Sequence, residues 1–385
     1  MAQSRRMNLL RHLLLAGLAV AREMRVFGLV LSLALTTACS EPVAPRGVNA
    51  LEPIPRRVNA PASNPLTEEK RELGRLLFWD PLLSGERDVS CASCHDPAFA
   101  YTDGARLARG TGNVELRRNT PTVLLATWNG LRGEGHLVPP EDAPMFWDNR
   151  ARSLEAQARG PLHAEGEMRG TMLIDGDVGG ELSRRLAAIP AYQDRFETAF
   201  GTREITEERI VMAIASFERG LSIGSSAFDR YARGDSGALS SAQKRGLSSF
   251  VSAGCATCHG GPMFSDFELH ALGAGTPHRG AVDRGDGRGR FRTPSLRNAT
   301  RTAPYMHDGS LATLDAVYEF YDSVDRDLDP ALGEVSGIHG SARNDVTAFF
   351  EALADKEFDD RIPTGVPSGL PVGGLRRAAK SAPHR

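Results

Sequence analysis

Cys91-Ala-Ser-Cys-His95 and Cys255-Ala-Thr-Cys-His259 are the two stretches that decide how this 385-residue chain folds. In each stretch two thiols stand three positions apart, and a histidine follows the second thiol directly. A c-type haem is attached through this pattern, because the two thiols bond to the vinyl groups on one edge of the macrocycle and the histidine ligates the iron. The sequence therefore predicts two covalently attached haems, one in each half of the chain.

A Cys-x-x-Cys pair by itself also occurs in redox dithiols and in zinc sites. Here a histidine follows in both copies, and the copies lie much further apart than the ~15 to 20 residues that separate the halves of a zinc ribbon. Of the five cysteines, only Cys39 lies outside the two motifs. This count provides no disulfide framework, so it favours haem over zinc or thiol chemistry.

The N-terminal segment 1–39 has the layout of a secretory signal. Met24 and Arg25 precede an apolar run over 26–35, and small residues follow up to Cys39. Met24 is a candidate for the true start. We expect export to the periplasm, followed either by acylation of Cys39, which would tether the protein to a membrane, or by simple signal cleavage nearby. A spanning anchor is disfavoured because arginines divide the apolar runs before they reach the ~20 residues that a span needs.

The rest of the chain is predicted to be mainly α-helical and divided into two halves. The formal net charge is −2, so there is no general basic surface for nucleic acid. Stretches rich in proline and lacking periodicity flank the helical part. The expected divisions are a flexible linker over 40–65, a first haem domain over 66–222, a second haem domain over 223–358 and a disordered tail over 359–385.

Helical spacing of apolar side chains marks the expected helices, whereas strand signals are scarce. The helices are expected within 67–77, 153–159, 206–219, 241–253, 313–321 and 344–354.

The helix expected over 313–321 offers a possible ligand for the second iron. Its spacing places Tyr318 and Tyr321 on the buried face. The simpler interpretation is two core tyrosines whose hydroxyl groups are hydrogen-bonded. Met263 and Met306 could supply sulfur ligands in the same half. Spacing does not choose among these side chains.

Seven further stretches, read together, point to a known family. They are Leu82-Leu-Ser-Gly85, Arg118-Asn-Thr-Pro-Thr122, Phe146-Trp-Asp-Asn-Arg150, Gln157-Ala-Arg-Gly-Pro161, Glu167-Met168, Pro294-Ser-Leu-Arg-Asn298 and Ala303-Pro-Tyr-Met-His-Asp-Gly309. With these stretches the chain resembles the bacterial dihaem cytochrome c peroxidases, and within them the MauG-like branch, from about Leu66 to Ala354. The resemblance implies two cytochrome-c-like helical domains, each with one c-type haem.

The resemblance also implies roles for single residues. Glu167 falls on the distal acid/base of the peroxidatic haem, Gln157 on another residue of that distal pocket, and Trp147 on the tryptophan between the haems. A calcium position is matched by the Asn119 side chain and by the backbone carbonyls of Thr302 and Pro304. Such oxygen ligands suit calcium.

Two departures from the cytochrome c peroxidase pattern bear on function. That group closes the resting peroxidatic haem with a histidine after the first motif, but no histidine occurs here between His95 and His136. The first haem should therefore have an open iron face. Where the second haem of that group carries an axial methionine, this chain aligns Tyr321, as MauG does. Phenolate favours ferric and higher iron, whereas a thioether raises the potential.

The resemblance implies a periplasmic peroxidase that reduces hydrogen peroxide with electrons relayed through the second haem from a small cytochrome or a similar donor. The alternative is a MauG-like oxidase that uses peroxide equivalents to modify a protein or an organic substrate. A third possibility is a non-enzymatic electron-transfer cytochrome.

Overall fold

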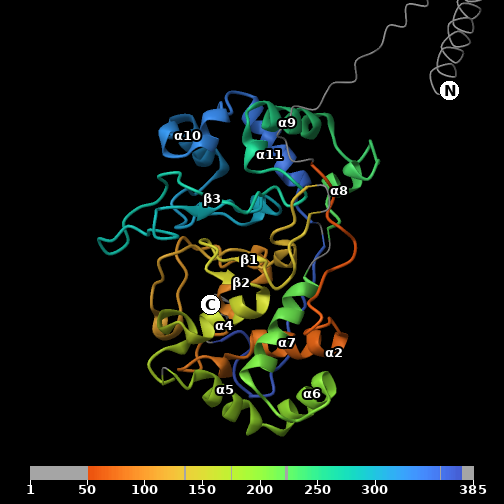
Figure 1. The fold of residues 1–385 in the computed structure, drawn as a ribbon, viewed down its shortest axis with the longest axis vertical. Coiled ribbons are helices and arrows are strands. Elements are labelled where there is room, and N and C mark those ends of the chain that lie inside the picture. Colours follow the sequence, from red (N-terminus) through yellow and green to blue (C-terminus); the bar gives the residue numbers. More distant parts are fainter. Residues whose placement is uncertain (1–50, 134–135, 175, 222–223, 356, 375–385) are drawn as a thin grey trace, which may run out of the picture. The chain divides into compact units, whose positions relative to one another are not determined.

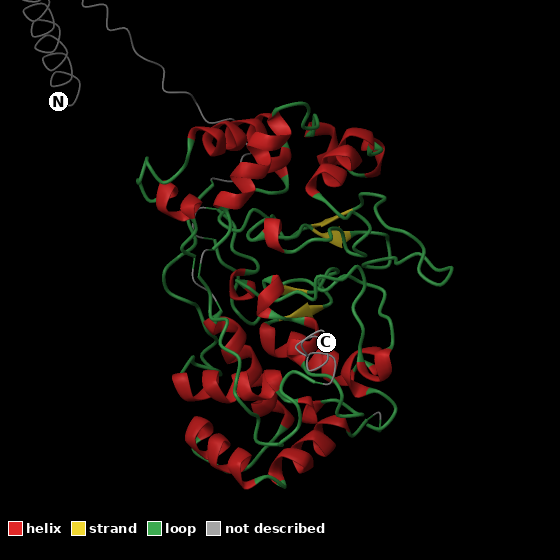
Figure 2. Ribbon diagram, turned by 180° about the vertical axis from the view of Figure 1, so that it is seen from behind, coloured by secondary structure: helices red, strands yellow, loops and turns green. Residues whose placement is uncertain are grey.

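The computed structural model describes residues 51–374, apart from 134–135, 175, 222–223 and 356. The expected signal segment with Met24 and Cys39 lies outside the described residues. Within the described part, no helix combines the length and the apolar character needed to cross a bilayer. Most of the regular structure is helical, as predicted, with a few short strands between the helices (Figure 2).

The helices of the first half enclose one hydrophobic core. They are α2 (Glu68–Trp79), α3 (Cys91–Cys94), α4 (Leu154–His163), α5 (Val178–Ala187), α6 (Pro190–Phe200) and α7 (Glu207–Gly220) (Figure 1). Thr67 caps α2, because its side chain accepts a hydrogen bond from the Lys70 N–H at 3.3 Å. The helices expected within 67–77, 153–159 and 206–219 are confirmed.

The second half has its own core, formed largely by phenylalanines. Its helices are α8 (Ala227–Ala232), α9 (Ser241–Ser252), α10 (Leu314–Ser323) and α11 (Ala342–Ala352). They confirm the helices expected within 241–253, 313–321 and 344–354. Short turns of 3-10 helix are η1 (Pro81–Leu83), η2 (Pro97–Phe99), η3 (Thr111–Asn113), η4 (Ala126–Trp128), η6 (Cys255–Thr257), η7 (Ala299–Arg301), η8 (Arg326–Leu328) and η9 (Pro330–Glu334), and η5 (Glu165–Arg169) is one π-helical turn.

Both halves pack the helix before their cysteine motif in the same way. In α2, a Cβ built on Gly74 would lie 1.9 Å from the Ala213 carbonyl oxygen of α7. In α9, a Cβ on Gly246 would lie 1.9 Å from the Asp345 carbonyl oxygen of α11. Only glycine permits backbones to approach this closely, so one glycine in each half brings the motif-bearing segment against the last helix of its core.

Two small antiparallel hairpins complete the regular structure. Strand β1 (Pro144–Met145) pairs with β2 (Ala151–Arg152), and β3 (Leu269–His270) pairs with β4 (Phe291–Arg292). The hairpins lie beside each other in Figure 1, and the Arg292 N–H of β4 donates to the Trp147 carbonyl after β1 at 2.7 Å. This contact joins the two halves at the functional region.

The segment 51–65 corrects the prediction of a flexible linker over 40–65. Ile54 is only 1% exposed, and its N–H donates to Oδ1 of Asp229 at 2.9 Å. Buried Asn64 donates to the Glu155 carboxylate at 2.8 Å and to the Met212 carbonyl at 2.9 Å. A few isolated apolar and amide side chains hold this segment, and such contacts leave no periodic signal in the sequence.

The tail predicted to be disordered over 359–385 is also packed, as far as Gly374. Val366 belongs to the first core, and the Ser368 hydroxyl donates to Oδ1 of Asp80 at 2.7 Å. The Gly373 N–H donates to the Trp79 carbonyl at 2.8 Å. Disorder was the wrong prediction for 359–374. Proline and glycine are common in irregular segments that have one fixed conformation, as well as in disordered segments. Residues 375–385 lie outside the described part.

Candidate haem sites

The first motif forms part of a cavity of about 560 Å³. Cys91, Cys94 and His95 all line it. Helix α3 supplies both cysteines and ends at His95, whose Nδ1 lies 3.0 Å from the Tyr101 carbonyl oxygen.

The second motif repeats this arrangement in a cavity of about 260 Å³. Cys255, Cys258 and His259 line it, and Nδ1 of His259 lies 3.0 Å from the Phe264 carbonyl oxygen. In both sites a carbonyl oxygen therefore accepts the Nδ1 proton, which leaves the Nε2 lone pair available to a metal. Burial lowers the pKa of both histidines, so each imidazole stays in the neutral form that ligates iron.

The four motif cysteines are free of disulfides. Burial raises the pKa of the Cys91 thiol, and it raises the pKa of Cys255 to about 11. Reactive redox dithiols have a lowered thiol pKa instead. The two cavities, the neutral histidines and the thiols that form no disulfide together fit covalent haem better than dithiol chemistry.

The first cavity brings the predicted distal residues together with His95. Gln157 and Pro161 stand one helical turn apart on α4, and Glu167 comes from the π-helical turn η5; all three line the cavity. Burial raises the pKa of Glu167, although Arg150 and Arg118 oppose this effect. The carboxyl group is therefore a better proton carrier near neutral pH than an exposed glutamate. Among the described residues that line this cavity, His95 is the only histidine.

The second cavity contains all the ligand candidates that the sequence suggested. Tyr318, Tyr321, Met263 and Met306 line it. The Tyr318 hydroxyl group lies 2.9 Å from Oγ1 of Thr347, as expected of a core tyrosine. The Tyr321 hydroxyl has no hydrogen-bond partner among the described residues, and burial together with Cys258 raises its pKa. Tyr321, Met263 and Met306 all line the cavity, so their positions do not identify the iron ligand. The Tyr321 hydroxyl, however, is available to bind a metal.

One wall is shared by the two cavities. Trp147 and Arg292 line both of them, and so does the segment 119–122. The Trp147 indole N–H donates to the Asn119 carbonyl at 3.0 Å, which fixes the ring in this wall. This is the location expected of a residue between two haems.

The residues proposed for calcium belong to one cavity. Asn119, Thr302 and Pro304 line the second cavity. The Asn119 side-chain nitrogen donates to the Ala105 carbonyl at 2.9 Å. Its Oδ1 therefore remains an acceptor, as a hard cation requires.

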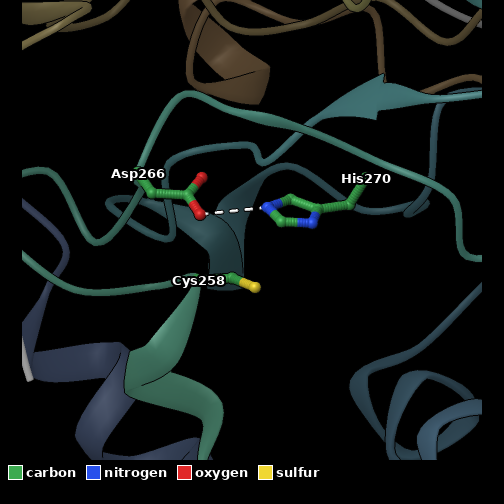
Figure 3. Close-up of side chains that lie close together, drawn as sticks. All are labelled: Cys258, Asp266 and His270. Carbon is green, nitrogen blue, oxygen red and sulfur yellow. Dashed lines mark hydrogen bonds and ion pairs between the residues drawn. The ribbon is translucent and has the colours of Figure 1, made fainter. Parts of the chain in front are cut away.

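A histidine that the sequence did not mark lies beside the second motif. Nε2 of His270 lies 3.0 Å from Oδ2 of Asp266 (Figure 3). Its Nδ1 lies 3.1 Å from Oδ2 of Asp329. Asp266, Cys258 and Asp329 raise the pKa of His270 to about 11. Cys258, Asp266 and His270 are close enough to hold a metal ion. A thioether bond from Cys258 to haem would remove the thiolate from this set, which leaves His270 held between the Asp266 and Asp329 carboxylates.

Two more residues of the cavities were not foreseen. Glu218 of α7 lines the first cavity, and its Oε2 is buried with no hydrogen-bond partner in the described part of the chain. Arg292 lies in the shared wall. The sequence offered no signal for either residue, because an acid beside Arg219 on a helix or an arginine in a short strand is common at protein surfaces.

These features define a mainly helical protein with two cavities, each lined by one Cys-x-x-Cys-His motif. The family model of the di-haem cytochrome c peroxidases matches residues 68–237. With the relatives below, this match shows that the chain belongs to the di-haem cytochrome c peroxidase family.

Proteins of both expected types are among the relatives. The methylamine utilization protein MauG of Methylorubrum extorquens is 38% identical over 313 residues, which cover 78% of this chain and 82% of that protein. The cytochrome c551 peroxidase of Nitrosomonas europaea is 33% identical, covering 80% of this chain and 86% of that protein. A solved structure of a MauG-like protein associated with microbial copper homeostasis superposes with a TM-score of 0.67 at 28% identity and covers 82% of this chain and 96% of that one.

Proposed function

We propose that this protein is a periplasmic dihaem c-type peroxidase that reduces hydrogen peroxide to water. One haem would be attached at Cys91 and Cys94 with His95 as iron ligand, and the other at Cys255 and Cys258 with His259. The observation that carries the proposal is the first cavity, where an acid with a raised pKa, Glu167, shares the space with a single histidine. A haem held there by Cys91, Cys94 and His95 would supply the iron chemistry that reduces peroxide.

Glu167 would handle the proton in this reaction. Each peroxide takes up two electrons and two protons and yields two waters. Cleavage of the O–O bond requires a proton to move from the inner to the outer oxygen, and Glu167 can accept it and return it because burial raises its pKa above that of an exposed glutamate. Gln157, on the same cavity wall, can hold the peroxide by hydrogen bonds. General acid/base help of this kind contributes typically ~10² to 10⁴ in rate.

Electrons would enter through the second site and pass the shared wall. Trp147 is the aromatic side chain that lines both cavities, and its ring is fixed by the hydrogen bond to Asn119. A calcium ion at Asn119, Thr302 and Pro304 would stiffen the same segment. The donor would be a small periplasmic cytochrome or a similar protein, and lipidation of Cys39 would keep the enzyme near a membrane.

A MauG-like oxidase is the second candidate, and the free hydroxyl of Tyr321 favours it. A phenolate ligand would stabilise ferric and higher iron at the second site, which suits the storage of oxidising equivalents for a protein or organic substrate. With a methionine ligand, the second site would instead suit electron uptake from a reduced cytochrome.

Absorption and electron paramagnetic resonance spectra of protein from a cytochrome-maturing host test the shared part of both candidates. We expect two haems per chain, with a high-spin ferric signal from the first. Low-spin iron alone would contradict an open first site and would point to Met145 or Met168, which also line that cavity. Steady-state peroxide consumption with reduced cytochrome c then separates the candidates, because only the scavenging peroxidase should turn over rapidly with this donor.

A further inference from the structure

Arg292 stands in the wall shared by the two cavities, and its charge lacks an acidic partner. Among the described residues, none forms an ion pair with it. Its Nε donates to the Phe146 carbonyl at 3.0 Å, and its guanidinium carbon lies 5.7 Å from the centre of the Phe267 ring. Both contacts orient the guanidinium group without neutralising it.

Among the described residues, three arginines are almost fully buried, and each is paired with an acid. Arg75 reaches Asp359 at 2.6 Å, Arg219 reaches Glu155 at 2.6 Å, and Arg297 reaches Asp229 at 2.9 Å. Such pairing is expected, because an unpaired charge in a water-poor environment is costly. Arg292 is half-buried, lines both cavities and has no such acidic partner among the described residues.

The nearest acid that acts on Arg292 is already engaged. Asp148 influences Arg292 by charge, but its carboxylate accepts from Arg118 at 2.7 Å and from Arg150 at 2.8 Å. Burial lowers the pKa of Arg292 to about 10 in spite of Asp148. A group that enters the cavities with its own negative charge would remove this penalty.

We propose that Arg292 binds the propionate carboxylates of both haems at the wall where the two cavities meet. This inference rests on the proposed function, since it requires a haem in each cavity. A guanidinium group has five N–H donors in a rigid fork that matches carboxylates. Nε uses one donor on Phe146, so the two terminal nitrogens retain four, enough for one carboxylate on each side.

Such a shared cation has an electrostatic consequence. Reduction adds one negative charge to each haem, and a nearby positive charge stabilises the reduced form. Arg292 therefore raises the potentials of both haems together. The backbone N–H of Arg292 donates to the Trp147 carbonyl at 2.7 Å, which joins the main chains of the two residues that line both cavities.

Spectroelectrochemical titration of the Arg292→Gln holoprotein tests the inference. We expect both haems to become harder to reduce, each by about tenfold in the reduction equilibrium, which is 59 mV for one electron. Arg292→Lys keeps the charge and should restore most of the shift. Arg132→Gln is the charge-matched control: Arg132 is exposed, pairs with Glu268 and lines neither cavity, so its loss should leave both potentials unchanged.

The haem content of each protein, measured by mass and by absorbance, keeps the two proposals apart. If the wild-type chain does not carry two haems, the proposed function fails. If it carries two and Arg292→Gln moves neither potential, only the role of Arg292 is overturned. A shift confined to one haem would overturn the shared clamp, and a loss of thermal stability with unchanged potentials would leave Arg292 a purely structural residue.

Discussion

The Tyr101 hydroxyl group donates to the backbone carbonyl of Asp359 at 2.5 Å, although the two residues are 258 positions apart. The Tyr101 carbonyl in turn lies 3.0 Å from Nδ1 of His95. Tyr101 thus connects the segment after the last helix, through one hydrogen bond on each side, to His95, the histidine expected to ligate the first iron. Further along, the Gly373 carbonyl accepts from the Ser93 hydroxyl inside the first motif at 2.7 Å. The C-terminal segment therefore helps to hold the first site.

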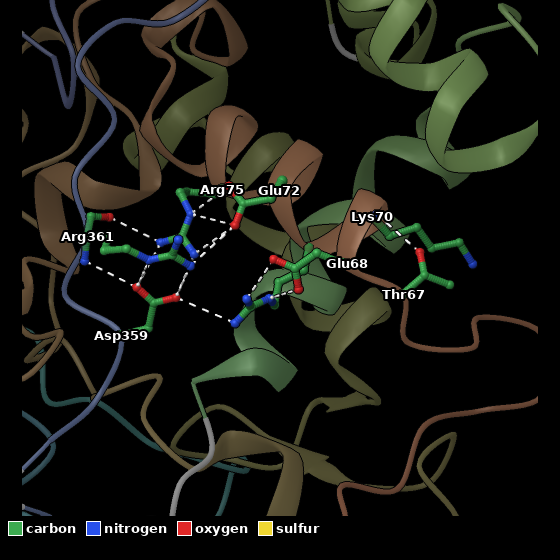
Figure 4. A network of polar contacts seen from close by, with 8 residues as sticks. Thr67, Glu68, Lys70, Glu72, Arg75, Asp359 and Arg361 are labelled. Atoms are coloured by element: carbon green, nitrogen blue, oxygen red, sulfur yellow. Dashed lines mark hydrogen bonds and ion pairs between the residues drawn. The ribbon is translucent and has the colours of Figure 1, made fainter.

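The Asp359 carboxylate anchors this segment on α2. It accepts from Arg75 at 2.6 Å and from Arg361 at 2.9 Å, and Arg75 also contacts Glu72 (Figure 4). Burial alone would raise the pKa of Asp359, but the hydrogen bonds from Arg361 and Arg75 hold it well below its usual range. The folded state is therefore stabilised above the ordinary aspartate pKa, and this contribution is lost as the pH falls toward the lowered value.

Asp359→Asn should destabilise the protein by about 2–4 kcal/mol at pH 7, because it leaves the buried charge of Arg75 without its closest partner. Chemical denaturation of the holoprotein measures the loss. Asp360→Asn is the control, since Asp360 is exposed and should tolerate the change. Equal stability of the two variants would show that the network in Figure 4 contributes nothing measurable.

Glu167→Gln should keep both haems bound and slow peroxide turnover by roughly 10² to 10⁴, because glutamine cannot carry the proton. Stopped-flow mixing with hydrogen peroxide measures the rate. Glu165→Gln is matched to it: Glu165 lies on the same π-helical turn but is exposed and pairs with Arg169. If both variants react at the wild-type rate, Glu167 is not the proton carrier.

Tyr321→Met should raise the potential of the second haem, on the order of a hundred millivolts, because a thioether favours ferrous iron and phenolate does not. A redox titration measures the change. Tyr318→Phe serves as control, since the Tyr318 hydroxyl pairs with Thr347 and should not affect the iron. An unshifted potential in Tyr321→Met would exclude Tyr321 as the ligand and would leave Met263 and Met306 as the candidate ligands.

Glu218→Gln should stabilise the protein, with a gain that grows between pH 5 and pH 8. Burial raises the pKa of Glu218 to about 8, against 4.5 for an ordinary glutamate. Between these values the folded state holds a proton that the unfolded state has lost, so stability falls as the pH rises through this window. Glutamine avoids this cost, and we expect a gain of roughly 1–3 kcal/mol at pH 8.

Denaturation of the Glu218→Gln holoprotein at pH 5 and pH 8 provides the measurement. Glu155→Gln is the opposite control: it breaks the pair with Arg219 at 2.6 Å and should destabilise the protein at both values. If Glu218→Gln increases the free energy of unfolding by the same amount at pH 5 and pH 8, Glu218 does not titrate in this range.

Local features of the chain were predictable without the structure. The haem motifs are read from adjacent residues, and the helices follow from apolar side chains at helical spacing, which is why α7 and α10 were expected close to their observed bounds. The same spacing places Tyr318 and Tyr321 on one face, and both line the second cavity. Gln157 and Glu167 required the family resemblance, because a lone polar side chain has no distinguishing local pattern.

Tertiary structure alone decided how distant segments complete the two sites. Spacing along the chain carries no information about contacts between residues that are hundreds of positions apart, so neither the bond from Tyr101 to Asp359 nor the shared wall with Trp147 and Arg292 could be read from it. The sequence by itself determined the two attachment motifs and the helices around them. Which side chains face both cavities, and which cavity-lining charge lacks an acidic partner, depends on the close approach of distant segments, and this exists only once the chain has folded.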